Sequence, residues 1–524
     1  MPDPVLPAID RGAVAAAIEA LDRDAIVGAR WFGAKGRTIT SIALDEAFVL
    51  DAGACHVLAI ATLALDDRTR QRYTFVLTGQ ALREAVPGDG AWRALVVAMA
   101  EGRTIAALAR TAGEGGPGHT ERGRPKPERP RLGPGPVTAA LVCRPAAAMP
   151  ARDDLGTERD LGADQSNTGV VIGERVLLKA YRRLQPGLNP DLEMTAFLTE
   201  QAHFGAVPPL AGFAELIEAA DGSRAATATT IAMAQAYVAD GADAFESIAA
   251  ALVGWIRAPG QVSLDAATEI AADLGSLTAG LHAALADGRG APEMAPRGAT
   301  RAELRAWPVT ARANLERALD VAPGAAGSTV RALGARIVEA LTILDALPTT
   351  PELQRTHGDY HLGQVLIAPD GFRIIDFEGE PLSTPEERRA HRHPLRDVAS
   401  MLRSLDHVAR SAARRVREGE RGADSEGDRA ASSGGAREVN IATDSVAHVG
   451  LDIDAWIRRG RERFLEAYRD GLREARVWID IDADLLRAFE VDKELYEFAY
   501  AATYLPTWLY APTEGMRALI EAEA

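Results

Sequence analysis

The chain is poor in cysteine and has no long hydrophobic run. It contains 524 residues but only two cysteines, Cys55 and Cys143, which excludes a disulfide framework and suits a reducing compartment. No stretch holds eighteen uninterrupted apolar residues, so no transmembrane helix is expected. The first residues, MPDPVLPAIDRG, carry acids and no basic segment before an apolar one, which argues against a secretory signal. We therefore expect a cytoplasmic protein without a membrane partner.

A surplus of positive charge is also missing. The formal net charge is −16, from 58 basic and 74 acidic residues. A protein that binds nucleic acid through its phosphates normally presents a basic face, so a small-molecule partner is favoured over nucleic acid.

Lysine is scarce even among the basic residues. The four lysines are Lys35, Lys126, Lys179 and Lys493, and all other basic residues are Arg. A Lys at the end of an apolar strand in such a chain is expected to be there for its own geometry, a compact charge on a flexible stem.

The order of patterns along the chain predicts an α+β fold of two lobes. Residues 1–100 read as an N-terminal cap subdomain, and 101–238 as a strand-rich lobe with strand patterns split by Gly and Asp turns. An insertion at about 111–136, dense in Gly, Pro and charge, is predicted to be disordered. Residues 239–524 read as a mainly helical lobe with a low-complexity insertion at about 411–447.

Most of the recognisable chemistry lies in RTHGDYHLGQVLIAPDGFRIIDFEGEP, residues 355–381. Two short strands flank the turn at APDG, and such a hairpin would bring Gln364 beside Asp376, with Asp359 just upstream. Amide and carboxylate oxygens suit Mg²⁺, and a separate carboxylate can orient a hydroxyl and accept its proton. Taken alone, the same residues would also suit a surface loop between two strands.

A cation for phosphate groups would complete this set, because phosphoryl transfer depends on positioning and charge neutralisation. Lys179 ends the apolar run VLLK, and Glu193 lies in the first turns of the following helix pattern. One of only four lysines therefore stands where this chemistry needs one, which favours an enzyme over a structural loop.

These residues resemble the bilobal protein-kinase-like fold. HGD with a polar residue five positions on is similar to the aminoglycoside and choline phosphotransferase branch. More narrowly, several segments between about 160 and 405 resemble bacterial maltokinases: DQSNTGVV, LKAYRRLQPGLNPDLE, HGDYHLGQVL, IDFEGEP and PLRDVASMLRS. RWFGAKGRTI (30–39) is similar to the cap region of that family, and DKELYEFAYAATYLPTW to its C-terminal helix.

The resemblance implies ATP-dependent phosphorylation of maltose at its anomeric hydroxyl, giving maltose 1-phosphate for α-glucan and glycogen synthesis. It implies Asp359 as the catalytic base and Gln364 and Asp376 as Mg²⁺ ligands. It also implies a nucleotide site in which Lys179 contacts the ATP phosphates and Glu193 orients Lys179. The remaining implied nucleotide contacts are Ser166, Asn167 and Thr168 over the phosphates, and Gln235, Tyr237 and Val238 at the adenine.

The acceptor side is less fixed. Its candidate residues are His361, Glu378, Glu380, Tyr504 and Trp508, while His357 and Asp397 are expected to support the catalytic loop. The family pattern has Asn-Arg-Pro where this chain has Tyr504-Leu505-Pro506. That departure leaves glucosamine, or another acceptor of an aminoglycoside-phosphotransferase-like kinase, as the alternative to maltose. A non-catalytic nucleotide-binding partner of a trehalose isomerase is the further alternative.

Overall fold

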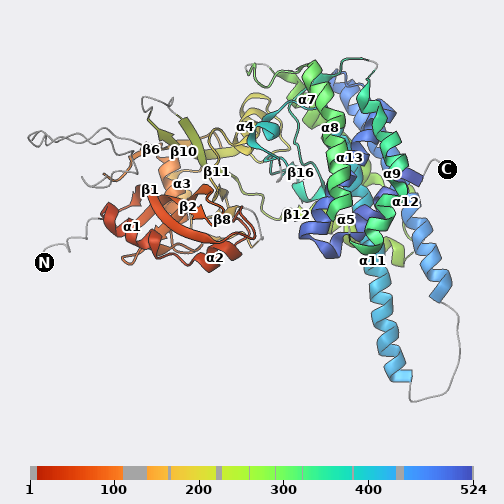
Figure 1. The fold of residues 1–524 in the computed structure, drawn as a ribbon, viewed down its shortest axis with the longest axis horizontal. Coiled ribbons are helices and arrows are strands. Elements are labelled where there is room, and N and C mark those ends of the chain that lie inside the picture. Colours follow the sequence, from red (N-terminus) through yellow and green to blue (C-terminus); the bar gives the residue numbers. More distant parts are fainter. Residues whose placement is uncertain are drawn as a thin grey trace, which may run out of the picture. The chain divides into compact units, whose positions relative to one another are not determined.

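The computed structural model describes residues 9–109, 139–162, 167–219, 227–258, 260–288, 291–321, 323–347, 349–380, 383–431 and 442–521. The chain divides into two compact units, Met1–Glu200 with Pro208–Ala239 and Gln201–Val207 with Asp240–Ala524. We call them unit 1 and unit 2. Unit 1 is rich in strands and unit 2 in helices (Figure 1), so the α+β bilobal fold is confirmed. In the described ranges, no helix is long and apolar enough to cross a membrane.

Unit 1 contains two antiparallel sheets. The first has the order β1-β2-β3-β4 and the second β5-β6-β10-β11-β9-β8-β7. The strands of the first are β1 (Ile39–Asp51), β2 (His56–Leu65), β3 (Arg70–Thr78) and β4 (Arg83–Glu84). The strands of the second are β5 (Thr104–Ala106), β6 (Ala139–Pro145), β7 (Glu158–Asp160), β8 (Thr168–Ile172), β9 (Val176–Ala180), β10 (Leu210–Glu218) and β11 (Thr227–Ala236).

The helices of unit 1 cover these sheets because both faces of the first sheet are apolar. Helix α3 (Ala91–Ala100) packs between the two sheets and shares one core with Phe48, Ile60 and Leu141. Helices α1 (Arg11–Glu19) and α2 (Arg23–Gly28) cover the opposite face of the first sheet over a second core. β2 is therefore almost wholly buried, as the near-continuous apolar run HVLAIATLAL requires. Helix α4 (Pro190–Ala196), the π-helical turn η2 (Phe197–Gln201) and η1 (Arg152–Asp154) complete this part of the chain.

Unit 2 is a bundle of long helices with two small antiparallel sheets. Its strands are β12 (Ala242–Asp243), β13 (Arg297–Gly298), β14 (Glu352–Leu353), β15 (Val365–Ala368) and β16 (Gly371–Ile374). Its helices are α5 (Ala244–Arg257), α6 (Leu264–Ala267), α7 (Glu269–Asp287), α8 (Arg301–Val321), α9 (Gly324–Leu341), α10 (Pro385–Arg389), α11 (Leu395–Ala431), α12 (Ala442–Ala475), α13 (Ala483–Tyr504) and α14 (Tyr510–Glu521). Short 3-10 turns are η3 (Thr342–Asp345), η4 (Leu362–Gln364) and η5 (Pro506–Trp508).

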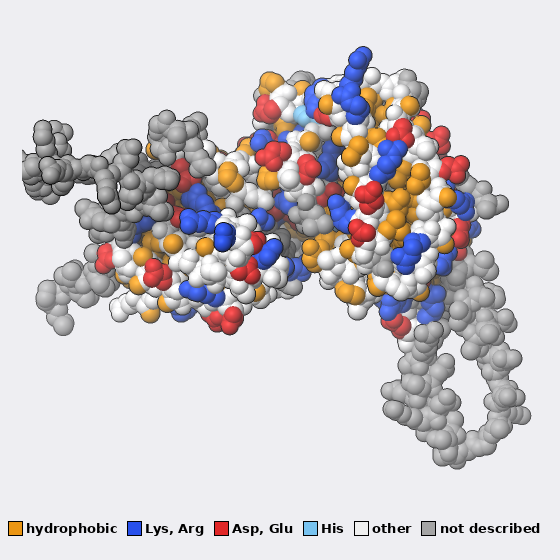
Figure 2. All heavy atoms as spheres, in the orientation of Figure 1, with side chains coloured by type: hydrophobic (Ala, Val, Ile, Leu, Met, Phe, Trp, Pro, Cys, Tyr) orange, Lys and Arg blue, Asp and Glu red, His pale blue; other side chains and the backbone are white. Residues whose placement is uncertain are grey.

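Close helix packing in unit 2 depends on glycine. Helices α7 and α12 approach so closely that a Cβ atom on Gly275 would overlap the backbone carbonyl of Phe464. Helix α13 is buried over most of its length and packs against α8, α9, α11 and α14. Over these helices, Figure 2 shows basic, acidic and apolar side chains interspersed on the visible face.

The segment at about 411–447 was predicted to be a low-complexity insertion. Helix α11 continues through its first part to Ala431. Ala412, Ala413 and Val416 are buried, and Arg414 pairs with Glu418 one turn later. The composition hid a narrow apolar stripe of small residues, which is enough to hold a helix against its neighbours. The other expected insertion, at about 111–136, lies outside the described residues.

Candidate active site

The hairpin of β15 and β16 brings the two predicted metal ligands, Gln364 and Asp376, together. Its register pairs Val365 with Ile374 and Ala368 with Gly371, so the residues that flank it meet at one end. Gln364 Nε2 lies 3.4 Å from Asp376 Oδ2, and the Ile375 N–H donates to the Gln364 carbonyl at 3.0 Å. Asp376 has a φ of +68°, a left-handed conformation that costs energy in a residue other than glycine and is common at functional sites. Hard oxygen donors on adjacent side chains fit a divalent cation such as Mg²⁺.

The loop that carries Asp359 is fixed by a buried carboxylate. Asp397 accepts hydrogen bonds from the backbone N–H groups of His357 at 2.7 Å and Gly358 at 3.1 Å. The ring of His357 donates from Nε2 to the Ile375 carbonyl at 3.0 Å. Burial lowers the pKa of His357, which keeps this ring neutral and suits a structural role. His357 and Asp397 therefore hold the loop that carries Asp359, as expected.

Asp359 belongs to a group of carboxylates held by one buried lysine. Lys493 Nζ, on α13, lies 3.0 Å from Asp359, 3.3 Å from Glu380 and 3.1 Å from Glu497. Burial alone would lower the pKa of Lys493, but these three carboxylates raise it well above its ordinary value. Burial would raise the pKa of the Asp359 carboxyl, but Lys493 and His361 outweigh it and lower this pKa to about 2. We call Asp359, Glu380, Lys493 and Glu497 the acceptor-side cluster.

Aromatic residues extend the acceptor-side cluster along α13. The Lys493 ammonium lies 4.8 Å from the centre of the Tyr496 ring. Tyr496 contacts Tyr500, and Tyr500 contacts Tyr504, with ring centres 6.4 Å and 5.0 Å apart. The hydroxyl of Tyr496 is buried and, among the described residues, has no hydrogen-bond partner. A buried hydroxyl without a partner costs free energy, so this position is prepared for a polar ligand.

The other predicted acceptor residues differ in their surroundings. His361 caps η4, and its Nε2 lies 3.8 Å from Asp359 Oδ2. Glu378 is half-buried and follows Asp376 and Phe377 in the same loop. Trp508 packs edge-on against Phe245 and near His407, so it makes the contacts of a packed side chain. Tyr504 is connected to the acceptor-side cluster through Tyr500 and Tyr496.

In unit 1, adjacent strands place the predicted phosphate-binding residues together. The register of β8 and β9 pairs Thr168 with Ala180 and Gly169 with Lys179, and Asn167 directly precedes β8. Lys179 is buried, and its Nζ lies 2.6 Å from Asp191 Oδ2. Asp191 sits in the first turn of α4, where its backbone N–H is capped by Asn189. Ser166 lies outside the described residues.

The pairing of Lys179 with Asp191 is a finding that sequence reasoning missed. The sequence pattern pointed to Glu193, two residues further along the same helix; Glu193 is half-buried, and its role stays a prediction. Asp191 is the last residue of the helix start Asn-Pro-Asp and Glu193 follows it by two, and spacing alone cannot say which acid reaches back to the strand. An ammonium held by a buried carboxylate is positioned for a phosphate oxygen.

The predicted adenine contacts lie at the end of β11. Gln235 is buried and pairs with Leu177 on β9. The Tyr237 N–H donates to the Arg175 carbonyl at 2.8 Å, and the Tyr237 ring lies below the Arg159 guanidinium. Val238 is half-buried, one residue before the end of unit 1 at Ala239.

Comparison with known proteins agrees with the resemblance of the sequence to phosphotransferases. A model of the phosphotransferase enzyme family (APH) matches residues 159–431. A glucosamine kinase of Streptacidiphilus jiangxiensis is 30% identical over 481 residues, which cover 90% of this chain and 90% of that protein. A glucosamine kinase of Mycolicibacterium smegmatis is 28% identical over 364 residues, which cover 70% of this chain and 80% of that protein.

Solved structures are similar over nearly the whole chain. A glucosamine kinase in complex with glucosamine, ADP and inorganic phosphate is 26% identical, with a TM-score of 0.65, over 96% of this chain and 98% of that one. A second crystal form of a glucosamine kinase has a TM-score of 0.67 at 26% identity, over 97% of this chain and 99% of that one.

Proposed function

Because the chain belongs to the phosphotransferase enzyme family, we propose that it is an ATP- and Mg²⁺-dependent sugar kinase whose acceptor is glucosamine. The main support for glucosamine as the acceptor is the charge of the acceptor-side cluster. It holds three carboxylates, with the Lys493 ammonium among them and Arg392 3.8 Å from Glu380. Three negative and two positive charges leave one negative charge, which favours an acceptor with an ammonium group over the neutral maltose.

The relatives favour the same choice. Both named relatives and the similar solved structures are glucosamine kinases, so they support the alternative reading over the maltokinase that the sequence motifs resemble. Maltose remains the second candidate because five motifs between about 160 and 405 resemble that family. The departure at Tyr504-Leu505, next to the end of the tyrosine series on α13, is where the two acceptors would be distinguished.

In the proposed reaction, Asp359 orients an acceptor hydroxyl and accepts its proton as the oxygen attacks the γ-phosphorus of ATP. A carboxylate with a pKa of about 2 is a weak base, so its main work is orientation, with proton transfer late in the step. That suits phosphoryl transfer, in which positioning and charge neutralisation dominate. Lys493 holds Asp359 ionised and in place.

The nucleotide side is proposed on residues of unit 1. Lys179, held by Asp191, binds the phosphates together with Asn167 and Thr168, and Gln235 to Val238 bind the adenine. Ser166, outside the described residues, is proposed as a further phosphate contact. Gln364 and Asp376 bind Mg²⁺, which neutralises phosphate charge when bound. Buried, free Cys55 and Cys143 suit a reducing cytoplasm, where ATP is available.

The test is ADP release from the purified protein with MgATP and a panel of glucosamine, N-acetylglucosamine, glucose and maltose. We expect the highest kcat/KM with glucosamine, and NMR of the product identifies the phosphorylated hydroxyl. A higher kcat/KM with maltose would replace glucosamine by the second candidate. No ADP release above background with any sugar would favour the non-catalytic partner of a trehalose isomerase.

Asp359→Asn tests the catalytic assignment. It keeps the shape of the side chain but cannot accept a proton, so kcat should fall by about 10²–10⁴-fold. The control is Asp470→Asn, an exposed acid on α12 paired with Arg473, which should keep wild-type activity. Equal activity of the two variants would remove Asp359 from the mechanism.

A further inference from the structure

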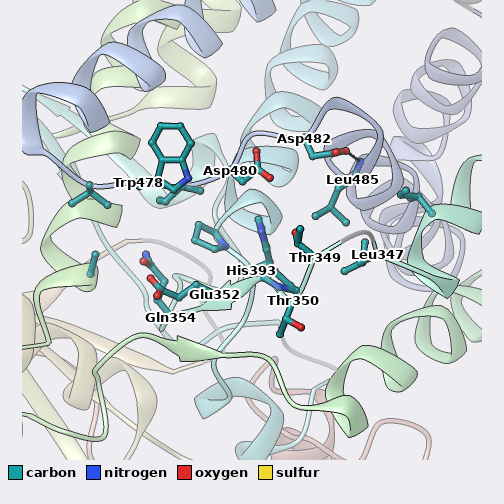
Figure 3. Close-up of a pocket in the computed structure, with 16 residues that line it drawn as sticks. Leu347, Thr349, Thr350, Glu352, Gln354, His393, Trp478, Asp480, Asp482 and Leu485 are labelled. Atoms are coloured by element: carbon teal, nitrogen blue, oxygen red, sulfur yellow. Dashed lines mark hydrogen bonds between the residues drawn. The ribbon is translucent and has the colours of Figure 1, made fainter.

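Unit 2 contains a cavity that none of the proposed catalytic residues lines. Its volume is about 540 Å³, within the range of small-molecule sites. Four parts of the chain surround it: the end of α7 at Ala286, the end of η3 with β14, the start of α11, and the connection from α12 to α13. Figure 3 shows His393 in the middle, with Glu352 and Gln354 on one side and Trp478, Asp480 and Asp482 on another.

His393 supplies a hydrogen-bond donor without an acceptor at this cavity. The residue is 3% exposed, and its Nδ1 accepts the Leu395 N–H at 3.2 Å. Burial lowers the pKa of His393 to about 3, so the ring is neutral at pH 7. A neutral ring that accepts at Nδ1 carries its proton on Nε2. Among the described residues, the Nε2–H group of His393 has no hydrogen-bond acceptor. The ring otherwise contacts two aromatic rings, those of Trp307 and Phe489.

Gln354 supplies the complementary acceptor. It is also 3% exposed, and its Nε2 donates to the His282 carbonyl at 3.3 Å. Its Oε1 accepts no hydrogen bond within the part of the chain that the structure describes. Two such atoms, one donor and one acceptor, on the lining of one cavity point to a ligand that carries both kinds of group.

The charges around the cavity restrict the ligand further. Glu352 and Asp480 are exposed at its edge, and Asp482 caps α13 by accepting the Leu485 N–H at 2.8 Å. No Lys or Arg is among the lining residues, and His393 is neutral. Anions are therefore repelled and cations attracted. Trp478 lies at the same edge with 88% of its surface exposed, and an exposed indole stacks well on a cation or a sugar ring.

We propose that this cavity is a second ligand-binding site, for a small protonated amine that also carries hydroxyl groups. The ammonium group meets Glu352 and Asp480. A ligand oxygen accepts from His393 Nε2, and a ligand hydroxyl donates to Gln354 Oε1. Trp478 covers the ring or carbon chain of the ligand. This site does not depend on the identity of the phosphoryl acceptor proposed above.

Binding here would reach the catalytic loop through two short segments. Gln354 precedes His357 by three residues, and it forms a β-bridge with Arg392, whose guanidinium lies 3.8 Å from Glu380. His393 begins the turn into α11, four residues before Asp397, the anchor of the His357 and Gly358 amides. A ligand that contacts both Gln354 and His393 therefore restrains the two segments that position Asp359.

The experiment measures binding of glucosamine, as the probe, by isothermal titration calorimetry to the wild type and to Trp478→Ala and Asp480→Asn. Both residues are exposed, so both variants should fold, and an unchanged Tm confirms it. We expect each variant to lose at least tenfold in affinity for one binding event. Asp320→Asn, an exposed acid on α8 outside the cavity, is the matched control and should stay within twofold of the wild type.

A second set of titrations compares sugars of different charge. Glucose should bind this site at least tenfold more weakly than glucosamine, and glucosamine 6-phosphate should not bind it. The proposal fails if Trp478→Ala and Asp480→Asn bind glucosamine with wild-type stoichiometry and affinity, or if glucose binds equally well. The two proposals can fail separately. If the kinase proposal is wrong, no ADP is released, but Trp478→Ala and Asp480→Asn still lose one glucosamine-binding event.

Discussion

Lys493 keeps Asp359 ionised, so its removal should change the pH dependence of the reaction. In Lys493→Met, burial still raises the pKa of Asp359, but the ammonium that lowers it to about 2 is gone. The pKa should then rise above the ordinary value of about 4. The carboxylate is the active form, so the acidic limb of kcat/KM should move to higher pH. A pH–rate profile from pH 4 to 8 measures this shift.

The control for this prediction is Lys35→Met. Lys35 is an exposed lysine whose Nζ donates to the Ala29 carbonyl, and its loss should leave the profile unchanged. An acidic limb that stays in place in Lys493→Met would show that Lys493 does not govern the protonation of Asp359.

Asp376 has an equally specific expected phenotype. Asp376→Asn removes the charge but suits the left-handed backbone at φ +68°, because Asn tolerates this conformation. The backbone should therefore persist while metal affinity falls on the order of 10–100-fold. Activity measured against Mg²⁺ concentration should show a half-maximal value raised by that factor. Asp370→Asn, in the exposed hairpin turn beside Arg373, should not change it, and an unchanged Mg²⁺ requirement in Asp376→Asn would exclude Asp376 as a ligand.

Residue-level prediction succeeded where sequence neighbours become spatial neighbours. Gln364 and Asp376 were predicted to meet because a hairpin separates them, and their side chains lie 3.4 Å apart. Lys493 comes from a helix more than a hundred residues away, and no local pattern connects it to Asp359. Lysine scarcity, which singled out Lys179, could have singled out Lys493 as well.

At the scale of elements, the α7–α12 contact gives a direct test of packing. Gly275→Ala would place a methyl group on the backbone carbonyl of Phe464, and backbone cannot move aside as a side chain can. We expect a loss of about 1–3 kcal/mol in the free energy of unfolding, measured by urea unfolding followed by circular dichroism.

The matched control is Gly334→Ala on α9. A Cβ atom there would meet nothing within 4 Å, and Ala is favoured over Gly inside a helix by about 0.5–1 kcal/mol. This variant should be neutral or more stable. Equal loss in both variants would mean that helix conformation, and not the α7–α12 distance, determines the result.

Elements follow the sequence where the apolar pattern is strong, as in β2, whose nearly continuous apolar run is almost wholly buried. The extension of α11 was missed because its buried residues are mostly alanines set among Arg and Glu. Alanine carries little apolar signal, although a row of alanines lets helices pack closely.

For the whole molecule, the buried histidines predict how stability depends on pH. His393 has a folded pKa of about 3 against about 6.5 when unfolded, and burial lowers the pKa of His357 in the same direction. Between pH 6.5 and 3, His393 therefore binds more protons in the unfolded chain than in the folded one, so stability falls on acidification by about 1.4 kcal/mol per pH unit for this group. The lowered pKa of His357 adds to the fall. Urea unfolding from pH 7 to 4 should show this fall.

The pH dependence of stability is opposite for His407. Burial would lower the pKa of His407, but Glu494, 3.1 Å away, raises it. The contribution of His407 to stability is therefore complete below pH 6.5 and is lost as the pH rises through its raised folded pKa. Stability should therefore be highest near neutral pH. His393→Gln should reduce the acidic slope, while His203→Asn, at an exposed position with φ +52°, should not. An acidic slope of zero in the wild type would contradict the burial of these neutral rings.

The bilobal α+β fold could be predicted because strand patterns precede helix patterns along most of the chain. The choice of acceptor could not be predicted from such patterns. In the function that we propose, it depends on carboxylates of the loop around Glu380 and of α13. These carboxylates meet at one lysine only in the folded protein. The maltokinase-like motifs describe the shared phosphoryl-transfer parts, and the departure at Tyr504-Leu505 lies beyond them.

Burial of lysine has a consequence for chemical modification. Lys179 and Lys493 are both enclosed, with side chains 9% exposed, and both are held by carboxylates as ammonium ions, the form that does not react with acylating reagents. Lys35 is exposed in unit 1. An amine-directed dye or cross-linker should therefore reach Lys35 well before Lys179 or Lys493, so the protein can be labelled or immobilised through Lys35 while these two buried lysines stay intact.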